Sequence, residues 1–234
     1  MVKQRPAMQN PNISPVNPLP PVVTALFLAI MGIEAVFSLG AYGLAGGAQA
    51  VGWRVAAIQD YGFSSDVFRW MLENGRYPPE HMMRFLTYAF VHGTFTHALF
   101  VGVMLLAMGK FVGEVLAQWA ILAVFVVGTV AGALAHGIFI EAQPWLVGGF
   151  PGVYGLIGAF TYLLYVRLVS KGSNGARAFA LIGFLMAIKL VFGLLFGADA
   201  TWLADLAGFF AGFAVTIVLA PGGWARLRAR LRHD

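Results

Sequence analysis

Six apolar stretches constrain this chain more than any other feature of its sequence. About 20 apolar residues in a helix span the roughly 30 Å of hydrocarbon in a bilayer. Because 59% of the 234 residues are hydrophobic and only 11% are charged, with a mean hydropathy of +0.78, the chain is too apolar for one soluble core. We therefore predict an all-α, polytopic membrane protein with a six-transmembrane-helix bundle. The helices are expected near residues 21–44, 94–113, 117–139, 147–167, 178–198 and 201–220.

The chain divides into three parts around one membrane domain. Residues 1–20 form a polar, proline-rich N-terminus, residues 21–220 form the membrane domain, and residues 221–234 form a basic tail. No small-residue cleavage site follows a short apolar core, so we expect the first helix to be retained and not removed as a signal peptide. The absence of cysteine excludes disulfides and thiol chemistry.

The basic residues indicate the orientation. Ten of the fifteen fall on one side of a six-pass chain, in the two termini and in the second and fourth connections, whereas four lie in the first loop. The positive-inside rule then places both termini in the cytoplasm. The formal net charge of +5 is a topology signal, so the bilayer is the expected partner and no nucleic-acid binding is predicted. The tail arginines are expected to be interfacial anchors, with anionic-lipid binding as the alternative. We expect an integral protein of a bacterial inner (plasma) membrane.

The first loop, residues 45–92, is too long for a simple connection and must have its own structure. Residues 66–75 place apolar side chains at helical spacing and end at Gly75, which predicts a short helix. This helix either lies in the outer membrane interface, with Trp53 and Trp70 as aromatic anchors, or belongs to a small loop subdomain packed over the helix ends. In the membrane domain, glycines gather most densely in the fourth helix, so we expect that helix at the centre of the bundle.

Four segments carry polar and glycine motifs in a specific order, at residues 83–87, 92–97, 148–158 and 204–212. In order and spacing they resemble the W-R-x-x-T, H-x-x-x-x-H, G-x-S-G-x-x-[FY]-G-x-x-G and A-H-x-x-G-x-x-x-G motifs of the rhomboid family of intramembrane serine proteases. The resemblance covers the second to sixth helices, which is most of the chain. The matching residues are Arg84, Thr87, His92, His97, Gly149, Tyr154, Gly155, Gly158, Gly208 and Gly212.

The residues at the family's catalytic positions differ from the family pattern. Alignment on the later glycines of the fourth helix puts Phe150 at the nucleophile position, and alignment on the earlier ones puts Pro151 there. Asp205 occupies the position of the general-base histidine. Val101 stands where the family usually has an asparagine that, with the residue equivalent to His97, hydrogen-bonds the oxyanion. The resemblance therefore predicts a rhomboid-like fold in which no catalytic group is intact.

These substitutions decide the expected function. Serine proteolysis needs a hydroxyl activated by a base and donors for the oxyanion. Phenylalanine has no nucleophilic atom, proline has no N–H, and valine cannot donate. We expect an inactive rhomboid that binds transmembrane segments of client proteins through an opening between the second and fifth helices. The alternative is a serine-type endopeptidase of this family acting through non-standard residues. A transporter is a third class, but no inverted repeat is visible.

The remaining polar residues form one candidate site. His97, Asp205 and Lys189 lie at depths where their side chains can meet, and charges inside a membrane usually pair. We predict a cluster of these three, either a retained polar site or a purely structural ion pair, with Glu34 as an alternative partner for Lys189. His136 is expected at the interface. The two histidines at 92 and 97 are poorly placed to share a metal ion on one helix face, so no metal or cofactor is predicted.

Overall fold

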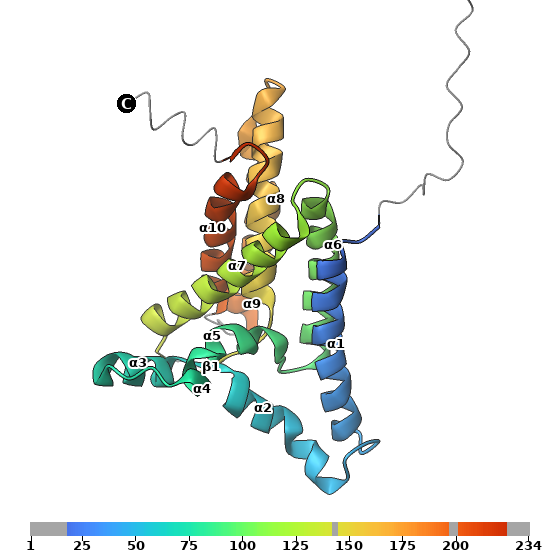
Figure 1. Ribbon diagram of the computed structural model, residues 1–234, viewed down its shortest axis with the longest axis vertical. Helices are drawn as coiled ribbons and strands as arrows, with labels where there is room; N and C mark the ends of the chain where they lie inside the picture. The colour runs from blue at the N-terminus through green and yellow to red at the C-terminus, as the bar shows by residue number, and fades with distance from the viewer. Residues whose placement is uncertain (1–17, 142–144, 197–200, 224–234) are drawn as a thin grey trace, which may run out of the picture.

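The computed structural model describes residues 18–141, 145–196 and 201–223, and these residues are almost entirely helical (Figure 1). The predicted N-terminal and tail segments therefore lie mostly outside the described residues. The elements are α1 (Pro21–Ala41), η1 (Ala48–Gly52), α2 (Trp53–Tyr61), β1 (Phe63–Ser64), α3 (Ser65–Asn74), α4 (Pro79–Met82), α5 (Arg84–Thr87), η2 (Tyr88–Phe90), α6 (Phe95–Gly113), α7 (Gln118–Phe139), β2 (Trp145–Leu146), α8 (Phe150–Ser170), η3 (Gly175–Phe179), α9 (Ala180–Phe196) and α10 (Thr201–Leu219).

All six predicted membrane segments are helices. Five of them, α1, α6, α7, α8 and α10, are long and apolar enough to cross a membrane by length and composition. The predicted fifth span, α9, has 17 described residues, which is the short end of the range that spans hydrocarbon. Residues 197–200, directly after it, lie outside the described residues. The sequence thus predicted an all-α polytopic bundle correctly.

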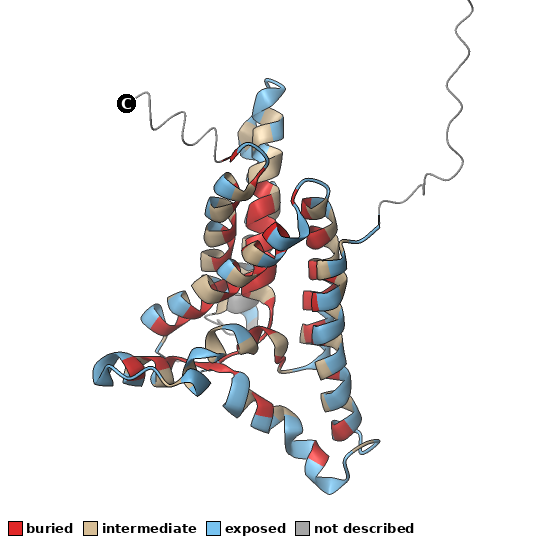
Figure 2. Ribbon diagram, viewed as in Figure 1, coloured by how far each residue is buried: buried red, intermediate tan, exposed pale blue. Residues whose placement is uncertain are grey.

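The fourth predicted helix, α8, is central, as its glycines indicated. It packs against α6, α7 and α10, and its first ten residues after Phe150 are nearly all buried (Figure 2). The main apolar core lies between these helices and α1, and includes Ile30, Leu105 and Ile157. Burial of such side chains stabilises the bundle mainly by close packing, because lipid tails are as apolar as the core itself.

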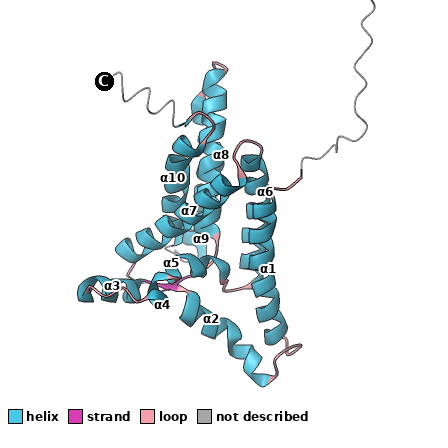
Figure 3. Ribbon diagram, viewed as in Figure 1, coloured by secondary structure: helices cyan, strands magenta, loops and turns pink. Residues whose placement is uncertain are grey.

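The first loop folds over the ends of α7 and α10. Figure 3 shows its short helices and the small antiparallel pair in which β1 joins β2. The predicted helix is α3, where the Ser64 hydroxyl accepts a hydrogen bond from the Val67 N–H and Gly75 ends the helix with φ 62°. Phe68 and Met71 of α3 are buried in a second core. The other members of this core are Phe63, Tyr88, Ala133, Leu146 and Ala204.

The buried face of α3 makes the loop a unit packed over the bundle, which is the second of the two descriptions offered for it. Trp53 and Trp70 remain partly exposed, and their role as anchors in the membrane interface stays a prediction. Packing of the loop also corrects one prediction. His136 is fully buried and its ring meets Phe63 edge-on at 6.2 Å, because β1 and α3 cover the end of α7 where an exposed interface was expected.

Candidate functional site

The site is built around the start of α8. The chain leaves β2 through Gly148, whose φ of 99° favours glycine, and the N–H of Gly148 donates to the Tyr88 carbonyl at 2.9 Å. The next N–H, from Gly149, donates to Nε2 of His92 at 3.2 Å. A Cβ atom at position 148 would collide with the His97 imidazole. The first turn of α8 is therefore held against η2 and the beginning of α6.

Phe150 occupies the centre of this arrangement. Its ring stacks on the imidazole of His97, with centroids 5.2 Å apart and planes 22° from parallel. On α8 itself, Tyr154 meets Phe150 edge-on at 6.3 Å. Pro151, by contrast, faces away: its ring lies against Gly132 of α7 and its carbonyl against Gly208 of α10. Phe150, and not Pro151, is therefore the residue of this turn that contacts His97.

An ion pair closes the site on the opposite side. Lys189 of α9 donates from Nζ to Oδ2 of Asp205 on α10, and Nζ also lies 5.6 Å from the Phe150 ring centroid and 5.8 Å from that of Tyr154. The Asp205 side chain is 1% exposed and that of Lys189 is 30% exposed. Two aromatic faces and a carboxylate thus stabilise one ammonium group at membrane depth.

The three residues of the predicted cluster are consequently linked through Phe150. Lys189 and Asp205 form an ion pair. The Lys189 ammonium also lies over the Phe150 ring, and the His97 imidazole stacks on the same ring. Val101 is also in place: it is fully buried, and a Cβ at Gly149 would lie 2.9 Å from its Cγ1. An apolar side chain therefore stands beside the N-terminus of α8 at the position where the family places a hydrogen-bond donor.

His92 supports the site as a neutral residue. Burial, followed by the neighbouring charge of His97, lowers the pKa of His92 to about 4. The unprotonated Nε2 can therefore accept the hydrogen bond from Gly149. The His92 ring lies 5.0 Å from that of His97 and edge-on to it. The backbone carbonyl of His92 accepts a hydrogen bond from Arg54 at 2.6 Å, which ties this corner to α2.

Glu34 does not reach Lys189. Its carboxylate is buried and accepts two hydrogen bonds from the Arg54 guanidinium, at 2.6 and 2.8 Å, and one from Ser38 at 2.9 Å. The alternative pairing of Glu34 with Lys189 is therefore wrong. Sequence reasoning searched for partners among the helices and missed Arg54. The signal was available, because a bidentate arginine is the usual partner of a buried carboxylate, and the first loop holds only four arginines.

Arg84 and Thr87, which match the motif before α6, hold the first loop in place through hydrogen bonds. Arg84 donates to the carbonyls of Gln59 and Gly62 at 2.7 and 2.9 Å, and Thr87 donates to the carbonyl of Tyr61 at 2.8 Å. These carbonyls belong to the C-terminal end of α2, where helices leave acceptors without a partner in the helix. Nearby, Tyr88 donates to the Thr129 carbonyl at 2.7 Å. Burial, and then the charge of Asp205, raises the pKa of Tyr88, which stays protonated.

The matching glycines allow α8 and α10 to approach backbone to backbone. A Cβ at Gly212 would overlap the Gly155 carbonyl, and one at Gly158 would overlap the Phe209 carbonyl. A Cβ at Gly155 would lie 3.0 Å from the Val124 carbonyl of α7. These contacts fix the height of Phe150 on α8 relative to Asp205 on α10.

The chemistry available here follows from these contacts. The first turn of α8 presents a phenyl ring and a proline, neither of which can attack a carbonyl carbon. The one serine in α8, Ser170, lies at the opposite end of the helix and donates to the Arg167 carbonyl. Phe150 contacts the His97 imidazole, the Lys189 ammonium, which pairs with the Asp205 carboxylate, and the ring of Tyr154. None of these four side chains carries the serine hydroxyl that a serine protease uses as its nucleophile.

Comparison with known proteins agrees with this geometry. A search of curated proteins found no match to the chain. A family model described as the rhomboid domain matches residues 79–222, a stretch that begins in the first loop and includes every element of the site from α5 to α10. It covers more than half of the chain, and together with the helical bundle and the order of the motifs it establishes that the chain belongs to the rhomboid family.

Proposed function

We propose that this protein is a proteolytically inactive rhomboid that binds transmembrane segments of other membrane proteins. The observation that carries the proposal is the place of Phe150. At the start of α8, where the family has its nucleophile, a phenyl ring stacks on His97 and lies beneath Lys189. The residue at the general-base position, Asp205, is already engaged in an ion pair. In this proposal a packed phenyl ring therefore stands in place of the nucleophile, and an ion-paired aspartate stands in place of the general base.

The apolar side chains that α6 and α9 leave exposed support a binding role. α6 packs on α1 and α8, and α9 packs on η3 and contributes Ile182 to the main core. Beyond these contacts each helix exposes large apolar side chains, among them Phe100 on α6 and Phe184 on α9. A client helix entering between α6 and α9 would meet apolar side chains and, farther in, the partly exposed Lys189. Such a surface suits a transmembrane segment that carries a single polar residue.

Activity is tested by covalent labelling of the purified full-length protein. We expect no labelling by a serine-directed fluorophosphonate above that of heat-denatured protein, and no cleavage of generic rhomboid substrates. The variant Phe150→Ser/Pro151→Gly/Asp205→His should recover weak activity at most, because Val101 still leaves the oxyanion without a donor and Lys189 would face the new imidazole. Labelling of the unaltered protein would contradict inactivity and support the alternative of an endopeptidase with non-standard residues.

Binding is tested by site-specific photo-crosslinking in cells. A photoreactive amino acid replaces Phe100 or Phe184, and Phe139, equally exposed at the end of α7, serves as the control position. We expect adducts with apolar transmembrane peptides at the first two positions in excess of those at the third. Equal adducts at all three positions would show ordinary contacts in a crowded membrane and would contradict a binding side between α6 and α9.

A further inference from the structure

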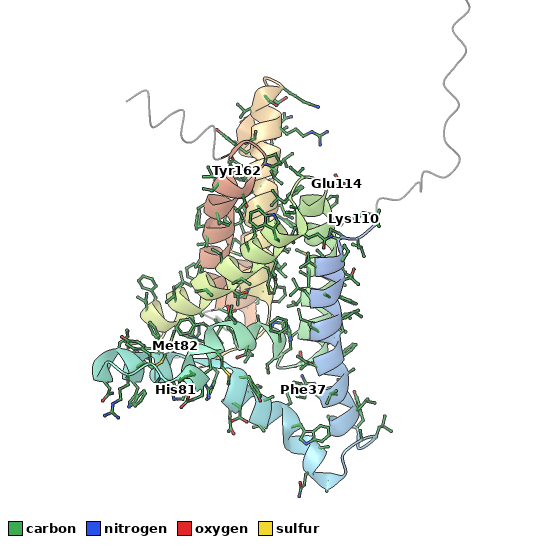
Figure 4. The ribbon with its side chains drawn as sticks, viewed as in Figure 1. Phe37, His81, Met82, Lys110, Glu114 and Tyr162 are labelled. Carbon is green, nitrogen blue, oxygen red and sulfur yellow. The ribbon has the colours of Figure 1, made fainter. Side chains whose placement is uncertain are left out.

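An apolar cavity of about 420 Å³ lies between α1, α2 and the segment that follows α5. Its wall is formed by Ile33, Val36 and Phe37 of α1, Ala57 and Tyr61 of α2, Thr87 of α5, and Phe90 and Val91 of the segment after α5. Its volume falls in the range typical of small-ligand sites. In Figure 1, α1 and α2 diverge from their connection, and Figure 4 labels Phe37 on the side of α1 toward the loop helices.

The cavity lies at the depth of lipid tails. Residues 33–37 follow the start of α1 at Pro21 by 12 to 16 positions, which places them roughly 18–24 Å along a helix that rises 1.5 Å per residue. In a hydrocarbon layer about 30 Å thick, this is the leaflet away from the described ends of the chain. Val36, one of the wall residues, is 50% exposed on the outside of α1, so the wall continues into the lipid-facing surface.

The Thr87 hydroxyl and the Arg54 guanidinium near the cavity already have partners within the protein, and the third polar side chain, Tyr61 of the wall, is 44% exposed. The Thr87 hydroxyl donates to the Tyr61 carbonyl. Arg54 is bound to Glu34 and to the His92 carbonyl, and its guanidinium lies 5.5 Å from the Phe37 ring centroid. A polar ligand would thus lose hydrogen bonds to water and gain few partners in a wall whose other six residues are apolar. A hydrocarbon chain is the occupant that fits this wall best.

Size and position exclude other apolar occupants. A helix about 10 Å wide fills roughly 420 Å³ in one 5.4 Å turn, so the cavity admits no more than a turn of a client helix. The described chain begins at Pro18 and ends at Gly223, both at the opposite end of the bundle (Figure 1). A terminal segment of the same chain would have to cross the bilayer to enter. A flexible alkyl chain is narrow enough for the cavity, and it can enter from the surrounding leaflet without crossing the bilayer.

We propose that this cavity binds one acyl chain of a bilayer lipid, which fills the space between α1 and the first loop. The lipid chain then packs between α1 and α2. Among the described residues, these two helices are also joined by the ion pair of Glu34 with Arg54. This inference does not depend on the proposed function, since it concerns the side of α1 and not the side of α9.

The test uses the full-length protein reconstituted in phosphatidylcholine vesicles that contain a lipid with a diazirine on one acyl chain. After irradiation, crosslinked peptides are mapped by mass spectrometry. We expect labelling of the cavity wall to exceed that of Ile138 and Phe139, which are exposed apolar side chains at the end of α7. Labelling no stronger than at these α7 positions, or crosslinks to a second copy of the protein in place of lipid, would overturn the proposal.

Variants that fill the cavity provide the second arm. Val36→Trp should reduce labelling of the wall to the α7 level, and Ala57→Phe should do the same from the α2 side. Leu28→Trp, at a residue of α1 that is 61% exposed and outside the wall, should leave the labelling unchanged. Thermal unfolding of each variant shows whether it still folds. Labelling of the wall is then compared for the variants that do. Wall labelling that persists in a folded, filled variant would contradict an acyl-chain site.

Discussion

At the scale of single residues, the pair of Lys189 with Asp205 is the most consequential contact in the bundle. The two residues are 16 positions apart, on different helices, and the carboxylate is almost fully buried whereas the ammonium is not. The consequences of losing either partner should therefore differ. A lysine without its partner can extend its stem toward water, but a buried aspartate cannot.

A double-mutant cycle measures this asymmetry. Lys189→Met removes the ammonium that pairs with the buried carboxylate and should lower the free energy of unfolding in detergent by about 3 kcal/mol, the lower end for breaking a buried pair. Asp205→Leu should cost less, and the double variant should recover much of the loss. Lys171→Met, the same change at an exposed lysine, is the control. Additive effects without coupling would show that the pair does not stabilise the fold.

The residue scale also shows what sequence can and cannot predict. The depths of Lys189 and Asp205 follow from counting along two apolar helices, so their proximity was predictable. The partner of Glu34 could have been narrowed to the four arginines of the first loop, but not to Arg54 among them, because no periodicity specifies the path of that loop over the bundle. His136 was misplaced for the same reason, since its burial depends on Phe63 and Phe68 of that loop. The sequence also did not show which residue of the α8 motif would contact His97, because that depends on the direction in which Phe150 and Pro151 point from the helix.

At the scale of elements, the contact between α8 and α10 is set by glycine. Gly212 faces the backbone of Gly155, and backbone atoms cannot move aside as a flexible side chain can. Close helix approach of this kind is typical of small residues in membranes. The sequence indicated such approaches from the spacing of its glycines, but not which helices would meet, because glycine spacing alone does not name a partner.

Adding one methyl group at this contact should therefore separate the helices. Gly212→Ala is expected to lower the free energy of unfolding by about 3 kcal/mol, the upper end of ordinary overpacking. The matched control is Gly32→Ala in α1, where an added Cβ meets no atom within 4 Å. That change should be neutral or stabilise by up to about 1 kcal/mol, because alanine favours helix. Equal effects in a thermal or denaturant titration would contradict tight packing of α8 on α10.

At the scale of the whole molecule, the number of crossings determines where the C-terminus lies. The described chain starts and ends at the same end of the bundle, and Figure 4 labels Lys110, in the last turn of α6, at that end too. An even number of crossings produces this arrangement, and it requires α9, the shortest of the six, to cross. The order of the helices was predictable from hydropathy, whereas the length of α9 lies at the limit where hydropathy alone does not decide.

Topology reporters resolve this directly. Fusions after Gly75, after Gly172 in the connection that follows α8, and at the C-terminus are each made with alkaline phosphatase, active only outside the cytoplasm, and with a fluorescent protein that folds only inside. The excess of basic residues at the termini and in the α8–η3 connection predicts phosphatase activity at Gly75 and fluorescence at the other two sites. A cytoplasmic Gly172 with an external C-terminus would mean that α9 does not cross. The opposite signal at all three sites would agree with six crossings but would place the side rich in basic residues outside the cytoplasm. That result would contradict the orientation assigned from charge.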